Sequence, residues 1–257
     1  MQENNRIKLP IDDLSKLLPG VSIDCVIFGF DKGSLHLLVL KWQNLSIWAL
    51  PSGFIYKDED MDRAAIRALQ ERTGLKLPYL RQFHTFGKVA RSDNLAFSKE
   101  FKPSDIPSAD LIAWLKQRFI SAGYLSLVDM RNSNPSPDIF SEACQWKPLG
   151  DLPPLIFDHR DIVNKALEQL RHQINYLPIG LSLLPEKFTM KDLQLLYEEI
   201  LQRKLDRGNF QKKMLKLDFL DRHEKQLTGA AHKAPYLYSF NKAKYNELLE
   251  KGIGYIS

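Results

Sequence analysis

Residues 53–75 contain charged side chains, some of them at helical spacing, that could bind a metal ion or a phosphate. Positions 68, 71 and 72 share one face of the helix expected over 60–73, because residues three and four apart are neighbours on a helix. Carboxylates on such a face would hold Mg²⁺, a hard cation that takes oxygen ligands. This chain has Ala68, Glu71 and Arg72 at the three positions. One carboxylate therefore remains, with a guanidinium beside it.

The spacing around this helix resembles the Nudix box of nucleoside-diphosphate-linked hydrolases, a loop, a helix and a loop. The box reads glycine, five residues, glutamate, seven residues, then arginine, glutamate, apolar, any, glutamate, glutamate, any, glycine and apolar. The positions that fit are Gly53, Glu59, Arg67, Leu69, Glu71, Gly74 and Leu75. Ala68 and Arg72 stand where the box has glutamates. The resemblance therefore implies a degenerate box, in which the metal and the activated water needed for hydrolysis lack their carboxylates.

The resemblance implies that the cleft of the Nudix-like domain binds a small effector. The side chains that we expect to line it are Trp48, Phe54, Arg72, Phe86 and Arg91. Packing in the core or on the surface is the alternative role for each of them. A free sugar and ADP-ribose are both open as the effector. The sugar is slightly favoured, because the site for a pyrophosphate and its metal is depleted of carboxylates. No cofactor and no bound metal are expected.

A basic helix in the last third of the chain is the second chemical signal. Residues 203–233 hold 9 basic and 4 acidic residues, so this stretch alone has the net charge of +5 that the whole chain carries. A local basic segment on a protein of otherwise balanced charge is typical of proteins that bind a polyanion. Asparagine reads adenine with two hydrogen bonds, and arginine or lysine binds guanine or phosphate. The candidate DNA-binding residues are Arg207, Asn209, Lys212, Lys213, Lys216, Lys225 and Lys233.

The elements around this basic helix are ordered as in a winged helix-turn-helix. A helix capped by Thr189 is followed by a five-residue link, a second helix capped by Asp206, and two weak strands near 219–222 and 236–240. A degenerate Nudix domain followed by this order resembles the Nudix-type transcriptional regulators, which include regulators of NAD metabolism and arabinose-responsive regulators. The resemblance implies a homodimer whose Nudix domains bind a small effector and whose paired winged helices bind a palindromic operator.

The fold class expected is α+β, a Nudix-like α/β/α sandwich followed by a winged helix-turn-helix domain. Strands are expected at 22–30, 35–42, 47–50, 79–86 and 118–128, and a helix at 159–173; residues 131–141 are expected to be a loop. The first domain is placed at 1–176, with a helical insertion at about 92–117, and the second at 177–257. The insertion departs from the compact pattern of the family.

Composition excludes several classes of protein. The chain has 257 residues, of which 44% are hydrophobic, so it can build a core and is not intrinsically disordered. It has no apolar run of about 18 residues that could span a bilayer, and the first residues do not read as a secretory signal. Two cysteines make neither a disulfide framework nor a zinc set. A cytoplasmic protein without membrane contact is therefore expected.

The function expected from these features is that of a ligand-responsive transcriptional regulator that binds its effector without hydrolysing it. Effector binding near 53–72 would shift the dimer and change the spacing of the recognition helices, which must match half-sites roughly 34–36 Å apart. A second hypothesis is a metal-dependent hydrolase of ADP-ribose or a nucleotide sugar, with the last domain serving dimerisation. A third is an RNA-binding accessory protein. Repression and activation are both open.

Overall fold

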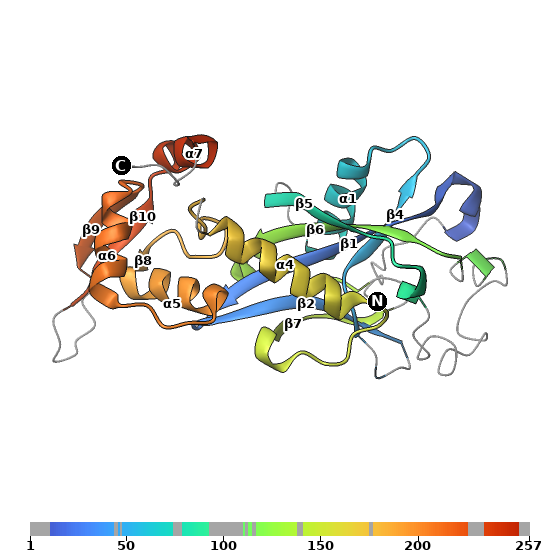
Figure 1. Ribbon diagram of the computed structural model, residues 1–257, viewed down its shortest axis with the longest axis horizontal. Coiled ribbons are helices and arrows are strands. Elements are labelled where there is room, and N and C mark those ends of the chain that lie inside the picture. Colours follow the sequence, from blue (N-terminus) through green and yellow to red (C-terminus); the bar gives the residue numbers. More distant parts are fainter. Residues whose placement is uncertain are drawn as a thin grey trace, which may run out of the picture. The chain divides into compact units, whose positions relative to one another are not determined.

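The structure is a computed structural model, and it describes residues 11–43, 46, 48–73, 79–92, 110, 113–114, 117–137, 141–174, 177–225 and 234–251. The chain divides into two compact units (Figure 1). The first unit comprises Met1–Gly29 and His36–Ala166, and the second comprises Phe30–Leu35 and Leu167–Ser257. The division falls inside a helix, and the domain boundary expected after residue 176 stays a prediction.

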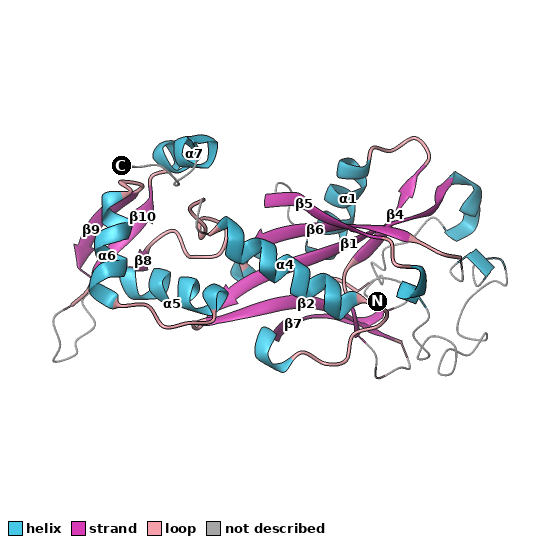
Figure 2. Cartoon of the chain, in the orientation of Figure 1, coloured by secondary structure: helices cyan, strands magenta, loops and turns pink. Residues whose placement is uncertain are grey.

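A seven-stranded sheet organises the first part of the chain (Figure 2). Its strands are β1 (Leu17–Asp31), β2 (Ser34–Trp42), β3 (Trp48–Ala49), β4 (Ser52–Tyr56), β5 (Tyr79–Phe86), β6 (Ile120–Val128) and β7 (Ser141–Pro148). The order is β3-β2-β1-β6-β5, with β4 paired to β1 and β7 to β2. β1 and β6 are parallel, whereas the pairs β1–β4, β2–β3, β2–β7 and β5–β6 are antiparallel.

Helices and 3-10 turns complete this part. Within the described ranges, the helices given with bounds are α1 (Met61–Thr73) and α4 (His159–Gln173), and the 3-10 turns are η1 (Ile11–Lys16), η2 (Val89–Ser92), η4 (Met130–Asn132) and η5 (Leu149–Asp151). Helices over 60–73 and 159–173 were expected, and both are present. The strands expected at 79–86 and 118–128 correspond to β5 and β6.

The two faces of β1 have different neighbours, because successive side chains of a strand point to opposite faces. Ile23, Cys25 and Ile27 pack in one core cluster with Ala64 and Leu69 of α1. Ser22 and Asp24 belong to the alternate set and are buried as well. The helix that carries the Nudix box therefore lies on one face of β1, and buried polar groups lie on the other.

The second unit contains a small sheet and three helices after α4. These elements are β8 (Phe188–Thr189), α5 (Met190–Leu201), α6 (Arg207–Lys216), β9 (Leu220–Lys225), β10 (Tyr236–Phe240) and α7 (Lys242–Lys251). The sheet is antiparallel in the order β8-β10-β9. α5 begins with a capping box, in which the Thr189 hydroxyl accepts from the Asp192 N–H and the Asp192 carboxylate accepts from the Thr189 N–H. The expected order of helix, turn, helix and ribbon is present.

Aromatic rings form the centre of the second unit. Phe240 packs against Phe188 and Phe219, with ring centroids 4.7 and 5.9 Å away. Gly180 lies beside this cluster with φ +143°, and a Cβ on it would stand 2.9 Å from the Phe240 ring. A side chain at position 180 would be strained by both the backbone and the contact.

Two differences from the expected elements have local causes. β7 was not expected, because Ser141–Pro148 is a half-exposed strand without clean alternation of apolar and polar residues. β1 begins at Leu17 rather than at 22, because Pro19 and Gly20 hide the strand in the sequence. Of the insertion at 92–117, only positions 92, 110, 113–114 and 117 lie within the described residues. Among the described residues, none of the helices is long and apolar enough to cross a membrane.

Candidate functional sites

Arg67 is the centre of the Nudix box. Its Nε and Nη2 donate to the two carboxylate oxygens of Glu59 at 2.9 and 2.8 Å, and Nη2 also donates to the Phe54 carbonyl at 2.8 Å. Burial alone would raise the pKa of Glu59, but the hydrogen bonds and charge of Arg67 lower it. The guanidinium also lies 4.8 Å from the centre of the Tyr56 ring. A bidentate pair of this kind is rigid, so it fixes the loop after β4 to α1.

The residues present do not fit a magnesium site. Ala68 is buried, and its Cβ lies 3.2 Å from where a Cβ on Gly53 would stand, so this face of α1 serves packing. Glu71 lies 3.7 Å from the Arg67 guanidinium. The Arg72 side chain and Gly74 lie outside the described residues. Within the described ranges, no group of three or more His, Cys, Asp or Glu could hold a metal ion.

A cavity of about 110 Å³ lies on the other face of β1. Its lining residues are Ser22, Asp24, Trp42, Ala49, Ser52, Phe54, Arg91, Phe119, Phe157 and His159. The walls are aromatic, and Trp114 packs edge-on against Phe54 with ring centroids 4.4 Å apart. Phe157 has φ +52°, a conformation that is rare for a bulky residue and typical of ligand sites. Aromatic walls with a few polar groups are the usual lining of a small-molecule site.

A buried ion cluster forms the polar side of this cavity. Arg91 donates from Nε and Nη2 to both carboxylate oxygens of Asp158 at 3.0 Å, and from Nη2 to Asp24 at 3.1 Å. The Ser121 hydroxyl donates to the same oxygen of Asp24 at 2.5 Å. Burial alone would lower the pKa of Arg91, but the two carboxylates raise it. Arg91 thus connects β1 to the start of α4, and most of its donors are used inside the protein.

His159, the first residue of α4, completes the cluster. Its Nδ1 accepts from the Leu50 N–H at 3.0 Å, and its Nε2 lies 3.6 Å from an oxygen of Asp24. Nδ1 must be unprotonated to accept this hydrogen bond, so the neutral ring carries its proton on Nε2. Burial lowers the pKa of His159, against the opposing effect of Asp24 and Asp158.

We expect the burial of His159 to make the protein less stable below a pH of about 6.5. In the unfolded chain the ring takes up a proton near its ordinary pKa of 6.5, whereas the folded protein takes it up only at lower pH. Between these values the unfolded state binds more protons, so the free energy of unfolding falls as pH falls, by at most about 1.4 kcal/mol per pH unit.

Urea unfolding between pH 7.5 and 5.5 measures this dependence. His159→Gln is expected to flatten it, because glutamine can accept from Leu50 and does not titrate. His172→Gln is the matched control, since His172 is an exposed residue of the same helix. An unchanged pH dependence in His159→Gln would show that other groups cause the loss.

The structure brings together part of the expected effector site. Phe54 and Arg91 line the cavity. Trp48 does not line it, and its ring lies 4.6 Å from the Lys147 ammonium. Phe86 is also outside, where it packs edge-on against His84 of β5. Arg72 cannot be placed, because its side chain is not described.

Several cavity residues were missed in the sequence, among them Asp24, Trp42, Phe157 and His159. One signal could have identified Asp24, which is a charged residue inside an otherwise apolar strand. Phe157 and His159 lie near the start of α4 and carry no comparable pattern.

α6 presents the expected basic residues to solvent. Phe210 and Met214 are buried, whereas Arg207, Asn209, Lys212, Lys213 and Lys216 are exposed. Asp206 caps the helix by accepting from the Asn209 N–H at 2.8 Å. The exposed set has two parts: Asn209 and Lys213 line a second cavity, described below, whereas Lys212 and Lys216 do not.

The turn before α6 is held by Glu198. Its carboxylate accepts from the Leu205 N–H, the Gln194 amide and the Lys204 ammonium, each at 2.9 Å. These hydrogen bonds lower the pKa of Glu198 to about 2. The angle between α5 and α6 therefore depends on a charged group that was not singled out in the sequence.

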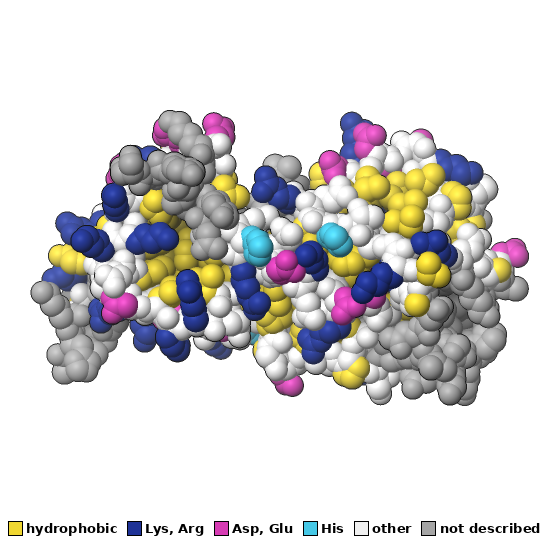
Figure 3. Space-filling view, viewed as in Figure 1, with side chains coloured by type: hydrophobic (Ala, Val, Ile, Leu, Met, Phe, Trp, Pro, Cys, Tyr) yellow, Lys and Arg dark blue, Asp and Glu magenta, His cyan; other side chains and the backbone are white. Residues whose placement is uncertain are grey.

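In the ribbon of β9 and β10, two basic side chains lie over one aromatic ring. Arg222 and Lys225 lie 4.8 and 5.2 Å from the centre of the same Tyr236 ring. Lys187 lines the same shallow hollow. Lys225 was expected to contact DNA, but Arg222 and Lys187 were not identified in the sequence. Lys233 lies outside the described residues. In Figure 3, basic side chains gather over this unit.

The chain matches two known domain families. Residues 18–169, more than half of the chain, match the Nudix domain, and residues 180–240 match the NrtR DNA-binding winged helix domain. A similar protein is the ADPR responsive transcriptional repressor NtrR of Acinetobacter baylyi, which is 28% identical over 235 residues, covering 89% of this chain and 84% of the relative.

Solved structures show the same fold. Shewanella oneidensis NrtR has a TM-score of 0.67 at 24% identity, covering 88% of this chain and 96% of that one. The same protein complexed with a 27mer DNA has a TM-score of 0.65 at 22% identity, covering 88% and 95%. The α+β class and the order of the two domains are thus confirmed. The chain belongs to the Nudix family, and its Nudix domain is followed by a winged helix domain of the NrtR DNA-binding type.

Proposed function

We propose that this protein is a homodimeric transcriptional repressor that leaves its operator when ADP-ribose binds to the Nudix domain without being hydrolysed. The observation that carries the proposal is the pairing of a DNA-binding winged helix with a Nudix box that has Ala68 in place of a metal-binding glutamate. The basic face of α6 supports DNA as the partner. As a regulator of transcription, the protein would act in the cytoplasm.

ADP-ribose is preferred over a free sugar as the effector. The sequence slightly favoured a sugar, but the similar Acinetobacter baylyi protein is named as ADPR responsive. The cavity of about 110 Å³ is smaller than the usual range for drug-sized ligands, roughly 300–1,000 Å³. It therefore suits one ring of such a ligand rather than the whole molecule.

The charge of the cavity indicates which part of the ligand enters it. Asp24 and Asp158 place two carboxylates around the single guanidinium of Arg91. A pyrophosphate in this cavity would meet net negative charge in a site of low dielectric, which is unfavourable. A neutral ring that stacks on Phe54 or Phe157 is favourable. We infer that a base or ribose of ADP-ribose enters the cavity, with the pyrophosphate outside it.

α4 begins at this cavity in the first unit and ends in the second unit, which contains the DNA-binding helices. Asp158 and His159 at its start belong to the ion cluster of the cavity. Near its end, in the second unit, Arg171 donates from Nε to the Ile200 carbonyl of α5 at 2.9 Å. We infer that ADP-ribose binding at the start of α4 alters the dimer, because α4 continues from the first unit into the second. The spacing of the two recognition helices in the dimer would change accordingly.

We expect Phe157→Ala to weaken ADP-ribose binding about 10- to 100-fold. An aromatic side chain that stacks on a base contributes about 1–3 kcal/mol, and Phe157 is a half-buried residue of the cavity wall. Isothermal titration calorimetry on the full chain measures the change.

Trp48→Ala is the matched control for this experiment. Trp48 is also a half-buried aromatic residue of the first unit, but it does not line the cavity. Its loss is expected to leave the affinity for ADP-ribose within about twofold. Equal affinities of Phe157→Ala and the unaltered protein would show that ADP-ribose binds elsewhere.

A further inference from the structure

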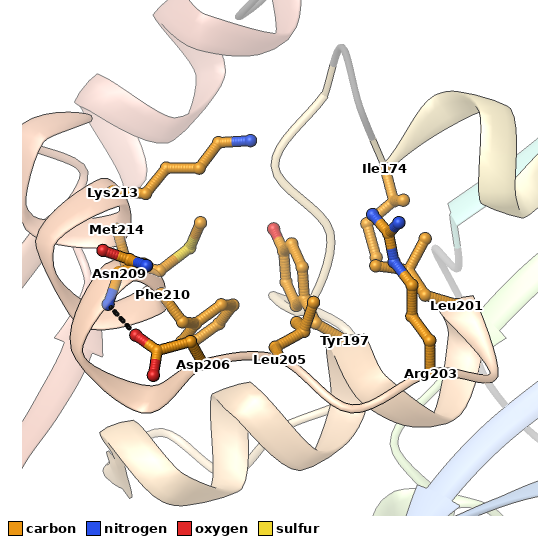
Figure 4. A pocket seen from close by; sticks show the side chains of 10 residues that line it. All are labelled: Ile174, Tyr197, Leu201, Arg203, Leu205, Asp206, Asn209, Phe210, Lys213 and Met214. Carbon is orange, nitrogen blue, oxygen red and sulfur yellow. Dashed lines mark hydrogen bonds between the residues drawn. The ribbon is translucent and has the colours of Figure 1, made fainter.

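A second cavity, of about 200 Å³, lies wholly within the second unit (Figure 4). Its floor is apolar, with Tyr197 and Phe210 packed edge-on at a centroid distance of 5.3 Å and the buried side chain of Met214 beside them. Ile174, at the end of α4, contributes another apolar side chain. The floor is thus suited to a small apolar ring.

Two cationic side chains stand over this floor from different elements. Lys213 extends from α6, and Arg203 comes from the turn between α5 and α6 (Figure 4). Neither side chain has a hydrogen bond or ion pair to another residue in the described part of the chain. Asp206, the acidic residue of the lining, is engaged as the cap of α6 through the Asn209 N–H. Among the described residues that line the cavity, the rim thus carries two cations and one carboxylate, which is a net positive charge.

We propose that this cavity binds a small amphipathic anion, an apolar ring that carries a carboxylate or phosphate. The ring would lie on Tyr197 and Phe210, and the anionic group would accept hydrogen bonds from Arg203 and Lys213. The volume is below the usual range of about 300–1,000 Å³ for drug-sized ligands. The cavity therefore suits a single ring with one anionic group.

The position of the cavity connects it to DNA binding. Asn209 and Lys213 line it and are also among the exposed residues of α6 that we assign to DNA. An anion held by Lys213 would remove that charge from the DNA-binding surface, so the anion and DNA would compete. This second step rests on the proposed function, whereas binding of the anion does not.

Titration of the full chain with 2-naphthoate, followed by the fluorescence of the probe, tests the site. The neutral 2-naphthamide has the same ring without the charge. We expect 2-naphthoate to bind at least about tenfold more tightly, since hydrogen bonds to charged groups contribute about that much. Arg203→Gln combined with Lys213→Gln is expected to remove this difference. Lys212→Gln, which alters an exposed lysine outside the cavity, is expected to retain it.

Equal binding of the two probes, or a preference for 2-naphthoate that survives when Arg203 and Lys213 are both replaced by glutamine, would overturn the proposal. If Arg203 and Lys213 serve only DNA phosphates, 2-naphthoate will not bind while Arg203→Gln weakens DNA binding, and this outcome also overturns it. In the competition experiment, 2-naphthoate should raise the apparent Kd for DNA in the unaltered protein but not in the variant with both replacements. Failure of the proposed function would instead appear as no DNA binding in the absence of any probe.

Discussion

Replacing Lys212 and Lys216 together by alanine is expected to weaken DNA binding about 30-fold per protomer at physiological salt. Both side chains are exposed on α6, and neither lines the neighbouring cavity. Each lost phosphate contact reduces the slope of log K against log salt by about 0.9, because fewer counterions are released. The slope should therefore flatten by about two per protomer, and the loss should be similar on specific and unrelated DNA.

Fluorescence anisotropy titrations at several salt concentrations measure both quantities. Lys57→Ala combined with Lys242→Ala is the matched control, since it removes two exposed lysines that do not belong to α6. If the control flattens the slope as much as the α6 variant does, the effect is one of net charge, and the assignment of α6 as the DNA-binding face is wrong.

Arg91→Ala is expected to lower the free energy of unfolding by about 3–5 kcal/mol. Its guanidinium is buried between Asp24 and Asp158, and its removal leaves two buried carboxylates without a cation. The unpaired carboxylates would repel one another in a site of low dielectric. Urea unfolding followed by circular dichroism measures the loss.

Arg131→Ala serves as the control for Arg91→Ala. Arg131 also pairs with a carboxylate, Asp129, but half of its side chain is exposed. An exposed pair contributes at most about 1 kcal/mol. Exchanging Asp24 and Asp158 for asparagine in the Arg91→Ala background should recover part of the stability, because the unpaired charges disappear. Equal losses in Arg91→Ala and Arg131→Ala would contradict the account of a buried ion cluster.

The Nudix box was predictable from sequence because its information is local. Glu59, Arg67 and Glu71 fall within one loop and one helix, so their spacing alone identified the box, and the structure adds the ion pairs among them. The winged helix was predictable for the same reason. Its caps, Thr189 and Asp206, directly precede the helices that they begin.

The cavity of the Nudix domain was not predictable in the same way. Asp24, Arg91 and His159 meet there although they lie far apart in the sequence. Their meeting depends on the order of the strands and on where α4 begins, which no local pattern specifies. Arg91 was expected to line the cleft and contact the effector, whereas its hydrogen bonds show that it holds the cavity together.

The basic surface illustrates a similar limit. The helical spacing placed Asn209, Lys212, Lys213 and Lys216 on one exposed face, and all four are exposed. It could not show that Asn209 and Lys213 border a cavity, because the opposite wall comes from the end of α4 and the turn after α5. Arg222 was missed because its role depends on the contact of its guanidinium with the Tyr236 ring on the neighbouring strand.

An anisotropy titration of the protein on its own upstream DNA, with ADP-ribose in the presence of Mg²⁺, tests whether ADP-ribose releases the DNA without being hydrolysed. The account predicts that ADP-ribose releases the DNA and is recovered intact afterwards, whereas L-arabinose and other pentoses leave the complex bound. DNA that stays bound at saturating ADP-ribose, or ADP-ribose that is cleaved during the titration, would contradict the account.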